Sequence, residues 1–450
     1  MQLVAGSDDD DGAGRESFSG APPIAVASPS VLGLDEAIET GLVQNPDLVA
    51  LRQNEGVSAA ALGVAQTYPI NPWVQIQVTP LQHNTEGGSG SVGHYVLVMQ
   101  TLQIAHQQQF REDMAASQLN QVRWNIHNAE LLNMAQTTRL FLWALYQRGI
   151  RDLARLTAEQ NQQLLEISQR QLDAGTITNA DVAIIRIDAG STRQQSELAE
   201  ANYQTALLDL RRQLNLPLEA QLELTGELTA LRWKSARDAA LSQIGSVVQM
   251  SDLDLTKDAD LIKRLTDGRP DLMAARADIT TAHANYNLAN AARTPDVQIG
   301  PYYQRDDFAT LFFGFRTQVD IPVLNNGKPL ARQRAAEYQQ RHITWQQLQD
   351  RAEIEAIVAV DRYERARKLV NAARADFREN LPAELQRLED QFKANEVDVL
   401  RVFQGRTSLI QNRRAMLDLL NELAQATTAV TAATGIPPKA LVSFASDEET

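Results

Sequence analysis

The chain has 450 residues and contains no cysteine. This absence excludes disulfides, thiolate metal sites, a cysteine nucleophile and lipid attachment through an N-terminal cysteine. It does not by itself fix the cellular compartment.

Long apolar runs are also missing. No stretch approaches about 18 consecutive apolar residues, so the sequence contains no candidate transmembrane helix. A transmembrane β-barrel is still compatible with the sequence, because each of its strands needs only about 9–11 alternating residues. Residues 1–30 carry the acidic run Asp8–Asp11 and are rich in Gly, Pro and Ser, so we expect a disordered N-terminal segment. No basic region followed by an apolar one is visible as a signal peptide, so either the chain is not exported or a signal has been removed.

Positive charge is scarce. The 42 Lys and Arg residues against 56 Asp and Glu residues give a net charge of −14, which argues against a nucleic-acid partner. Aromatic residues make up only 6% of the chain against 44% hydrophobic residues, which suits long, closely packed helices. At roughly 150 residues per domain the length predicts about three domains.

Catalytic motifs are missing as well. The sequence has no G-x-S-x-G, Walker A or zinc motif. Acidic residues such as Asp361 stand four positions from Arg or Lys in the predicted helices, a spacing typical of ion pairs on a solvent-exposed helix face. Gly88–Gly93 fits a dinucleotide fingerprint, but a strand-like pattern follows it, which favours a flexible hairpin loop. His83 and His94 flank this loop and are too few for a closed metal site. We therefore predict neither an enzyme nor a cofactor.

An internal repeat is present. Pro46–Arg52 matches Pro270–Arg276 at five of seven positions, about 220 residues later. The same order holds for two further pairs: Val74–Ile76 with Val297–Ile299, and Asn215–Pro217 with Gly435–Pro437. Three matches in one order at one spacing predict a duplication.

Each half of the chain predicts the same elements. The first repeat, 31–230, contains a helix broken at Asn45-Pro46, a β-hairpin at 73–102, a long helix to 172, a turn and a helix to 214. The second repeat, 269–438, contains a helix, a β-hairpin at 296–322, a long helix over 330–393, a turn and a helix to 434. A connecting segment, 231–268, separates them, and 439–450 is a C-terminal tail.

The second long helix predicts a coiled-coil seam. Apolar positions alternate spacings of four and three: Ala352, Ala356, Ala359, Tyr363, Ala366, Val370, Ala373 and Phe377. The fold class is therefore mainly α with a small β part. Four short strands cannot close a barrel within one chain, whereas three copies would supply twelve strands and a closed lumen.

This combination resembles the TolC-type outer-membrane efflux protein family, from about residue 32 to 438. The motifs that carry the resemblance are Leu34–Ile38 leading to Asn45–Leu48, Arg269–Leu272, Ile321–Gly327, Asp181-Val182 and Asp398–Leu400. The link Gln103–His106 departs from the family by lacking its usual Gly pair. The polar hairpin and Asn325-Asn326-Gly327 are similar to the heavy-metal-cation branch.

The resemblance implies a homotrimer with a 12-stranded β-barrel in the outer membrane and a long α-helical coiled-coil barrel in the periplasm. It implies the exit duct of a tripartite efflux system, which docks on a periplasmic adaptor protein and an inner-membrane transporter. We therefore expect a passive channel for small molecules or metal ions. The alternative is a soluble coiled-coil scaffold, and a third reading is a periplasmic metal-binding protein. Exposure of Leu311–Phe315 would argue against the scaffold.

The resemblance also assigns residues to a periplasmic tip. Acidic gate candidates are Asp173, Asp181, Glu396 and Asp398, and adaptor-contact turn candidates are Gly175, Thr176 and Asn395. Symmetry-related carboxylates around a narrow lumen would attract cations and repel anions. Asp181 and Asp398 also stand at helix starts, where aspartate is a favoured cap, so a purely structural role remains open for both.

Overall fold

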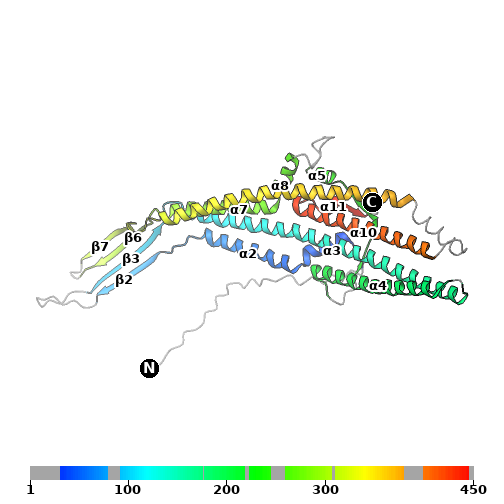
Figure 1. Cartoon of the computed structure of the whole chain (residues 1–450). Helices are drawn as coiled ribbons and strands as arrows, with labels where there is room; N and C mark the ends of the chain where they lie inside the picture. The colour runs from blue at the N-terminus through cyan, green and yellow to red at the C-terminus, as the bar shows by residue number, and fades with distance from the viewer. Residues whose placement is uncertain are drawn as a thin grey trace, which may run out of the picture.

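The computed structural model describes residues 31–79, 92–175, 177–217, 222–244, 259–306, 310–379 and 399–444. The molecule is elongated, with the labelled strands β2, β3, β6 and β7 at one end and helices running lengthwise away from them (Figure 1). The segments predicted at 1–30, in the hairpin loop containing His83 and Gly88, and at the turn around Asn395 lie outside the described residues. Among the helices that are described, none has the length and hydropathy needed to cross a membrane.

The chain enters the fold through two short helices, α1 (Leu34–Gln44) and α2 (Pro46–Gln66). Asn45 separates them because its side-chain oxygen accepts hydrogen bonds from the backbone N–H groups of Asp47 (3.1 Å) and Leu48 (3.2 Å). Pro46 follows at the first helical position, where its missing N–H costs nothing. The predicted break at Asn45-Pro46 is confirmed.

The lengthwise helices match the predicted pattern. They are α3 (Gln107–Asp173), α4 (Asn179–Leu214), α7 (Pro270–Ala291), α8 (Lys328–Glu379) and α10 (Val399–Thr434). The 67 residues of α3 span about 100 Å at 1.5 Å per residue. Of the eight seam positions predicted on α8, the six from Ala352 to Val370 are buried and Ala373 is half-buried, whereas the side chain of Phe377 lies outside the described residues.

The helices form a layer whose order follows from their contacts. Near the sheet, α2 packs on α3, α3 on α7, and α7 on α8. Farther from the sheet, α4 packs on α3, α3 on α10, and α10 on α8. In Figure 1, α7 lies beside α8 and α4 lies at the end remote from the strands.

The strands form one antiparallel sheet in the order β2-β3-β6-β7. Their bounds are β2 Trp73–Thr79, β3 Gly93–Leu102, β6 Val297–Arg305 and β7 Leu311–Val319, which confirms the four predicted strands. The two hairpins meet through β3 and β6, where Val96 pairs with Tyr303.

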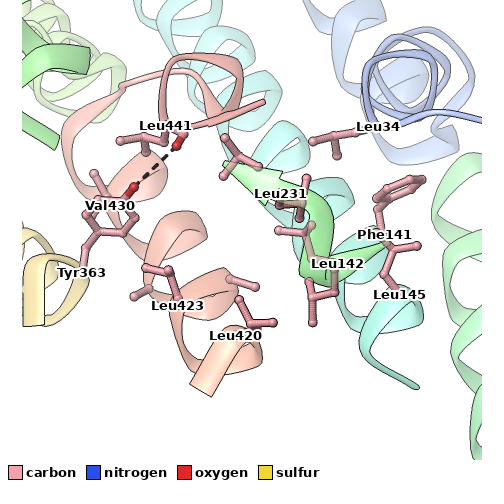
Figure 2. Close-up of a cluster of buried hydrophobic side chains, with 14 of the residues drawn as sticks. Leu34, Phe141, Leu142, Leu145, Leu231, Tyr363, Leu420, Leu423, Val430 and Leu441 are labelled. Atoms are coloured by element: carbon pink, nitrogen blue, oxygen red, sulfur yellow. Dashed lines mark hydrogen bonds between the residues drawn. The ribbon is translucent and has the colours of Figure 1, made fainter. Parts of the chain in front are cut away.

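The main hydrophobic core lies in the middle of the helical layer. Figure 2 shows side chains from distant parts of the chain converging there, among them Phe141, Leu231, Leu420 and Leu441. The buried hydroxyl of Tyr363 donates hydrogen bonds to the carbonyl oxygens of Lys234 (2.5 Å) and Leu441 (3.5 Å). Burial raises the pKa of this hydroxyl well above its usual value, so it stays protonated and can donate.

Short elements beside this core complete the fold. Strand β1 (Val31–Leu32) pairs in parallel with β4 (Glu223–Leu224), and β5 (Leu231–Trp233) pairs antiparallel with β8 (Val442–Phe444). Helices α5 (Ala236–Ile244), α6 (Ala259–Asp267) and α11 (Pro438–Leu441) accompany them. The range 231–268 thus holds a strand and two helices, and 439–444 belongs to the core, with Leu441 fully buried.

Candidate functional site

One face of the sheet is apolar and exposed. Residues that pair directly across strands point to the same side, so Val74 shares a face with Val98, and Val96 shares it with Tyr303 and Phe313. We define the apolar sheet face as Val74, Ile76, Val78, Val96, Val98, Leu102, Ile299, Tyr303, Leu311, Phe313, Phe315 and Val319. Ile76 is 68% exposed, Phe313 77% and Phe315 79%. The predicted exposure of Leu311–Phe315 is confirmed, and most of the apolar sheet face remains uncovered by the residues that the structure describes.

The other face of the sheet is rich in glutamine. We define the polar sheet face as Gln75, Gln77, Tyr95, Thr101, Gln298, Tyr302, Gln304, Arg316 and Gln318. The same side also carries Trp73, Leu97, Met99 and Phe312, of which Leu97 and Met99 are fully buried. The rings of Tyr95 and Tyr302 lie 5.9 Å apart on it. The two faces of the sheet thus differ: one carries mainly apolar side chains, and the other carries most of the hydrogen-bonding side chains.

Two local features hold β3 against β6. Gly300 lies so close to β3 that a Cβ atom there would collide with the carbonyl oxygen of Val98. His94 is half-buried, and its Nε2 forms a 3.1 Å hydrogen bond with the Tyr303 hydroxyl of the neighbouring strand. Among the described residues, no group of three or more His, Cys, Asp or Glu side chains could hold a metal ion.

The molecule has two open edges of different composition. The first edge consists of β2, α2 and α4, and the second edge of β7 and α8, because each of these elements packs on neighbours from one side of the layer. Large apolar side chains are exposed on both edges: Val57, Val64, Ile184, Ile187 and Leu198 on the first, and Ile343, Ile354 and Val358 on the second. An unpaired strand edge beside exposed apolar helices is typical of a surface that another chain covers.

The turn between α3 and α4 forms the end remote from the sheet. Helix α3 ends at Asp173, and Gly175 then takes a left-handed φ of 73°, as predicted for a helix-ending glycine. Asp173 and Gly175 are exposed, whereas Thr176 lies outside the described residues.

Asp181 caps the start of α4. Its Oδ2 accepts hydrogen bonds from the Thr178 backbone N–H (3.0 Å) and hydroxyl (2.6 Å), and its own N–H donates to the Thr178 hydroxyl (3.3 Å). These hydrogen bonds hold the pKa of the Asp181 carboxyl below its usual value. The capping geometry considered for Asp181 is therefore present. Asn395, Glu396 and Asp398 lie outside the described residues, so their roles and the gate role of Asp181 stay predictions.

Arg269, the first residue of the Arg269–Leu272 motif, holds three helices together. Its buried guanidinium binds both carboxylate oxygens of Asp271 (3.0 and 2.7 Å), Glu355 on α8 (3.4 Å) and the carbonyl oxygen of Ala433 on α10 (3.1 Å). Burial lowers the pKa of Arg269, but its bonds to Asp271 outweigh that effect and raise it overall. One charged side chain thus ties α7, α8 and α10 together.

Comparisons with known proteins agree with this architecture. No protein-family model matches the chain. A curated relative, the pyoverdine export outer membrane protein OpmQ of Pseudomonas putida, is 24% identical over 237 residues, which cover 51% of this chain and 46% of the relative. The chain thus aligns with about half the length of this relative.

Solved structures share the fold over most of the chain. One of them is a crystal structure of CusC, from work on its folding and transmembrane channel formation. It aligns with a TM-score of 0.68 and 16% identity over 89% of this chain and 91% of the CusC chain. The Campylobacter jejuni CmeC outer membrane channel has a TM-score of 0.68 and 13% identity, covering 97% and 93%. These comparisons confirm the predicted resemblance to the TolC-type outer-membrane efflux protein family.

Proposed function

Because the chain has the fold of TolC-type outer-membrane channels, we propose that three copies form the exit duct of a tripartite export system. The duct lies in the outer membrane and extends into the periplasm, where it meets an adaptor protein and an inner-membrane transporter. It conducts small molecules or metal ions passively, with energy supplied by the transporter.

The pair of open edges is the observation that carries this proposal. The first edge of one copy meets the second edge of the next, β7 beside β2 and α8 beside α2 and α4. Two different surfaces that meet head to tail produce a ring when the rotation closes. Three copies of a four-stranded sheet give twelve strands, enough for a barrel with an open lumen.

The two sheet faces support the same arrangement. The apolar sheet face meets lipid hydrocarbon on the outside, and the polar sheet face lines a wet lumen with amide groups. A soluble coiled-coil scaffold is disfavoured, because it would leave Phe313 and Phe315 in water at 77% and 79% exposure.

We place the tip of the duct at the α3–α4 turn and at the corresponding turn near residue 395. The gate candidates Asp173, Asp181, Glu396 and Asp398 would ring the lumen there, and Gly175, Thr176 and Asn395 would meet the adaptor. The Asp181 carboxylate is held in place by its hydrogen bond from the Thr178 hydroxyl. In a gate role, its negative charge would act on ions in the lumen while the carboxylate keeps this hydrogen bond. OpmQ is named for pyoverdine export, and the branch that this sequence resembles suggests metal cations as cargo; transport of both by the reconstituted protein can be measured side by side.

The decisive experiment is the mass of the full chain extracted from membranes, measured by light scattering with the detergent contribution subtracted. A particle close to three times 49.8 kDa that conducts ions in a planar bilayer supports the duct. A particle that is monomeric or dimeric without detergent overturns it. Ile187→Glu, on the first edge, should dissociate the trimer, whereas Arg155→Glu, an exposed position of α3, which belongs to neither edge, should leave its mass unchanged.

A further inference from the structure

A cavity of ligand size lies within a single chain, between α6, α7 and α8. Its volume is ≈ 530 Å³, within the range of about 300–1,000 Å³ typical of small-molecule sites. All of its lining residues belong to one chain, although α8, which carries its aromatic side, is also part of the second edge. Ligand binding at this site can be measured separately from the trimeric assembly proposed above.

The walls of this cavity are aromatic on one side and apolar on the other. Tyr338, His342 and Trp345 stand at helical spacing on α8, with the His342 and Trp345 rings 6.0 Å apart in an edge-to-face arrangement. Leu272 and Ile279 of α7 face them across the cavity. Such walls accept a flat ring, because aromatic faces and aliphatic side chains both pack against its two sides.

Arg276 supplies a positive charge to the same cavity. Within the described part of the chain, its guanidinium makes no ion pair. Arg52, which holds the same position in the matching motif on α2, contacts Glu130 (2.7 Å) and the Leu42 carbonyl oxygen (2.7 Å). The two halves therefore differ: Arg52 links α2 to α3, whereas Arg276 is exposed at the cavity and makes no hydrogen bond or ion pair with the described residues.

The remaining polar groups limit the charge of an occupant. Asp267, at the end of α6, accepts a 3.3 Å hydrogen bond from Gln349 of α8 and lines the same cavity. A second negative charge on the ligand would meet this carboxylate, whereas a single one can bind Arg276 in a bidentate manner.

We infer that this cavity, the aryl pocket, binds a small aromatic monocarboxylate. The ring lies between Trp345 and the α7 side chains, and the carboxylate binds Arg276. Because the ligand would touch α6, α7 and α8 together, its binding also stabilises their packing.

The test uses the full-length protein in detergent with 2-naphthoate as the probe, and empty micelles as the blank. We expect saturable uptake of one probe per chain in equilibrium dialysis, together with quenching of tryptophan fluorescence. The neutral analogue 2-naphthylmethanol should bind about tenfold more weakly, since a hydrogen bond to a charged group is lost. Uptake no greater than the micelle blank, or equal binding of both probes, would overturn the inference.

Variants locate the site. Arg276→Gln should weaken 2-naphthoate binding about tenfold, while Arg276→Lys keeps most of it and Arg332→Gln, an exposed arginine of α8 outside the cavity, changes nothing. Trp345→Phe should remove the quenching, and Trp124→Phe should not. If Arg332→Gln weakens binding as much as Arg276→Gln, or Trp124→Phe removes the quenching instead, the aryl pocket is not the site. Light-scattering mass and bilayer conductance of the same samples report separately on the duct.

Discussion

In the helical middle of the molecule, Phe141, Leu420 and Leu423 are fully buried, whereas at the sheet end Phe313 and Phe315 are 77% and 79% exposed. Both regions use alternating or periodic apolar residues of similar size. The middle has helices on several sides and covers its own side chains. The sheet is a single layer, and among the described residues its apolar side chains Ile76, Phe313 and Phe315 remain largely exposed. In the proposed duct, lipid covers them. Apolar residues of the helical middle therefore stabilise the fold of the single chain, whereas those of the sheet face are suited to contact with the chain's surroundings.

The largest expected effect tests that difference directly. Phe141→Ala should cost about 3–5 kcal/mol of unfolding free energy, because it opens a cavity in the core. Phe313→Ala should change the same free energy by less than about 0.5 kcal/mol, as surface substitutions usually do. Denaturant unfolding of both variants in one detergent, followed by helical circular dichroism, measures the difference. Equal losses would mean that the sheet face contributes to the chain's own core.

The next effect concerns the charged tie in the helical middle. Arg269→Met removes the partner of Asp271, Glu355 and the Ala433 carbonyl group. We expect a loss of about 2–3 kcal/mol, below the full cost of a broken buried pair because both carboxylates keep some contact with water. Arg351→Met is the matched control: that arginine pairs with the same Glu355 but its side chain is 76% exposed, so about 0–0.5 kcal/mol is expected. Indistinguishable unfolding curves for the two would rule out the role given to Arg269.

A charge placed on either face of the sheet sharpens the comparison further. If the apolar sheet face meets lipid, Phe313→Arg should destabilise the vesicle-inserted protein by about 2–4 kcal/mol at mid-depth. Gln318→Arg, on the polar sheet face of the same strand, should have little effect. Urea titration of protein folded into phosphatidylcholine vesicles would measure both. Identical midpoints would contradict the assignment of the two faces.

The smallest effect is expected at the far end, where neither face is involved. Hydrogen bonds from Thr178 lower the folded-state pKa of Asp181, so the folded chain binds this proton less readily than the unfolded chain. The resulting stability is complete above the ordinary value of 3.8 and is lost as the pH falls below it. Asp181→Asn should therefore lower the thermal midpoint slightly at neutral pH and match the wild type in strong acid. Thermal unfolding followed over a pH series measures this difference, and a gap between the two proteins that is as large in strong acid as at neutral pH would contradict it.

The sequence predicts best where a pattern is long. The strand at 73–79 follows from the alternation of Val74, Ile76 and Val78, and α3 follows from an uninterrupted helical pattern. The sequence also placed Asp181 at a helix start as a capping candidate; in the structure Thr178 is the N-cap, and Asp181 completes a capping box with it. Duplication of the chain and its trimeric assembly stay predictions.

Short and long-range features could not be predicted. Strands β1, β4, β5 and β8 have only two or three residues each, too few to show a period. The open edges emerge only when helices distant in sequence are placed side by side. Arg52 pairs with Glu130, whereas Arg276, at the same position of the matching motif, lines the aryl pocket. The two motifs look alike in sequence, so this difference could not be predicted from them.

The pairing of β5 with β8 has a consequence for how the protein is made. Residues 231–233 find their partner only in residues 442–444, and Tyr363 donates its hydroxyl hydrogen to the carbonyl oxygens of Lys234 and Leu441. The core therefore cannot be completed until those late residues have left the ribosome, because contacts so distant in sequence close last. During synthesis the chain remains open, and an open chain is the form that can be threaded across a membrane before it folds.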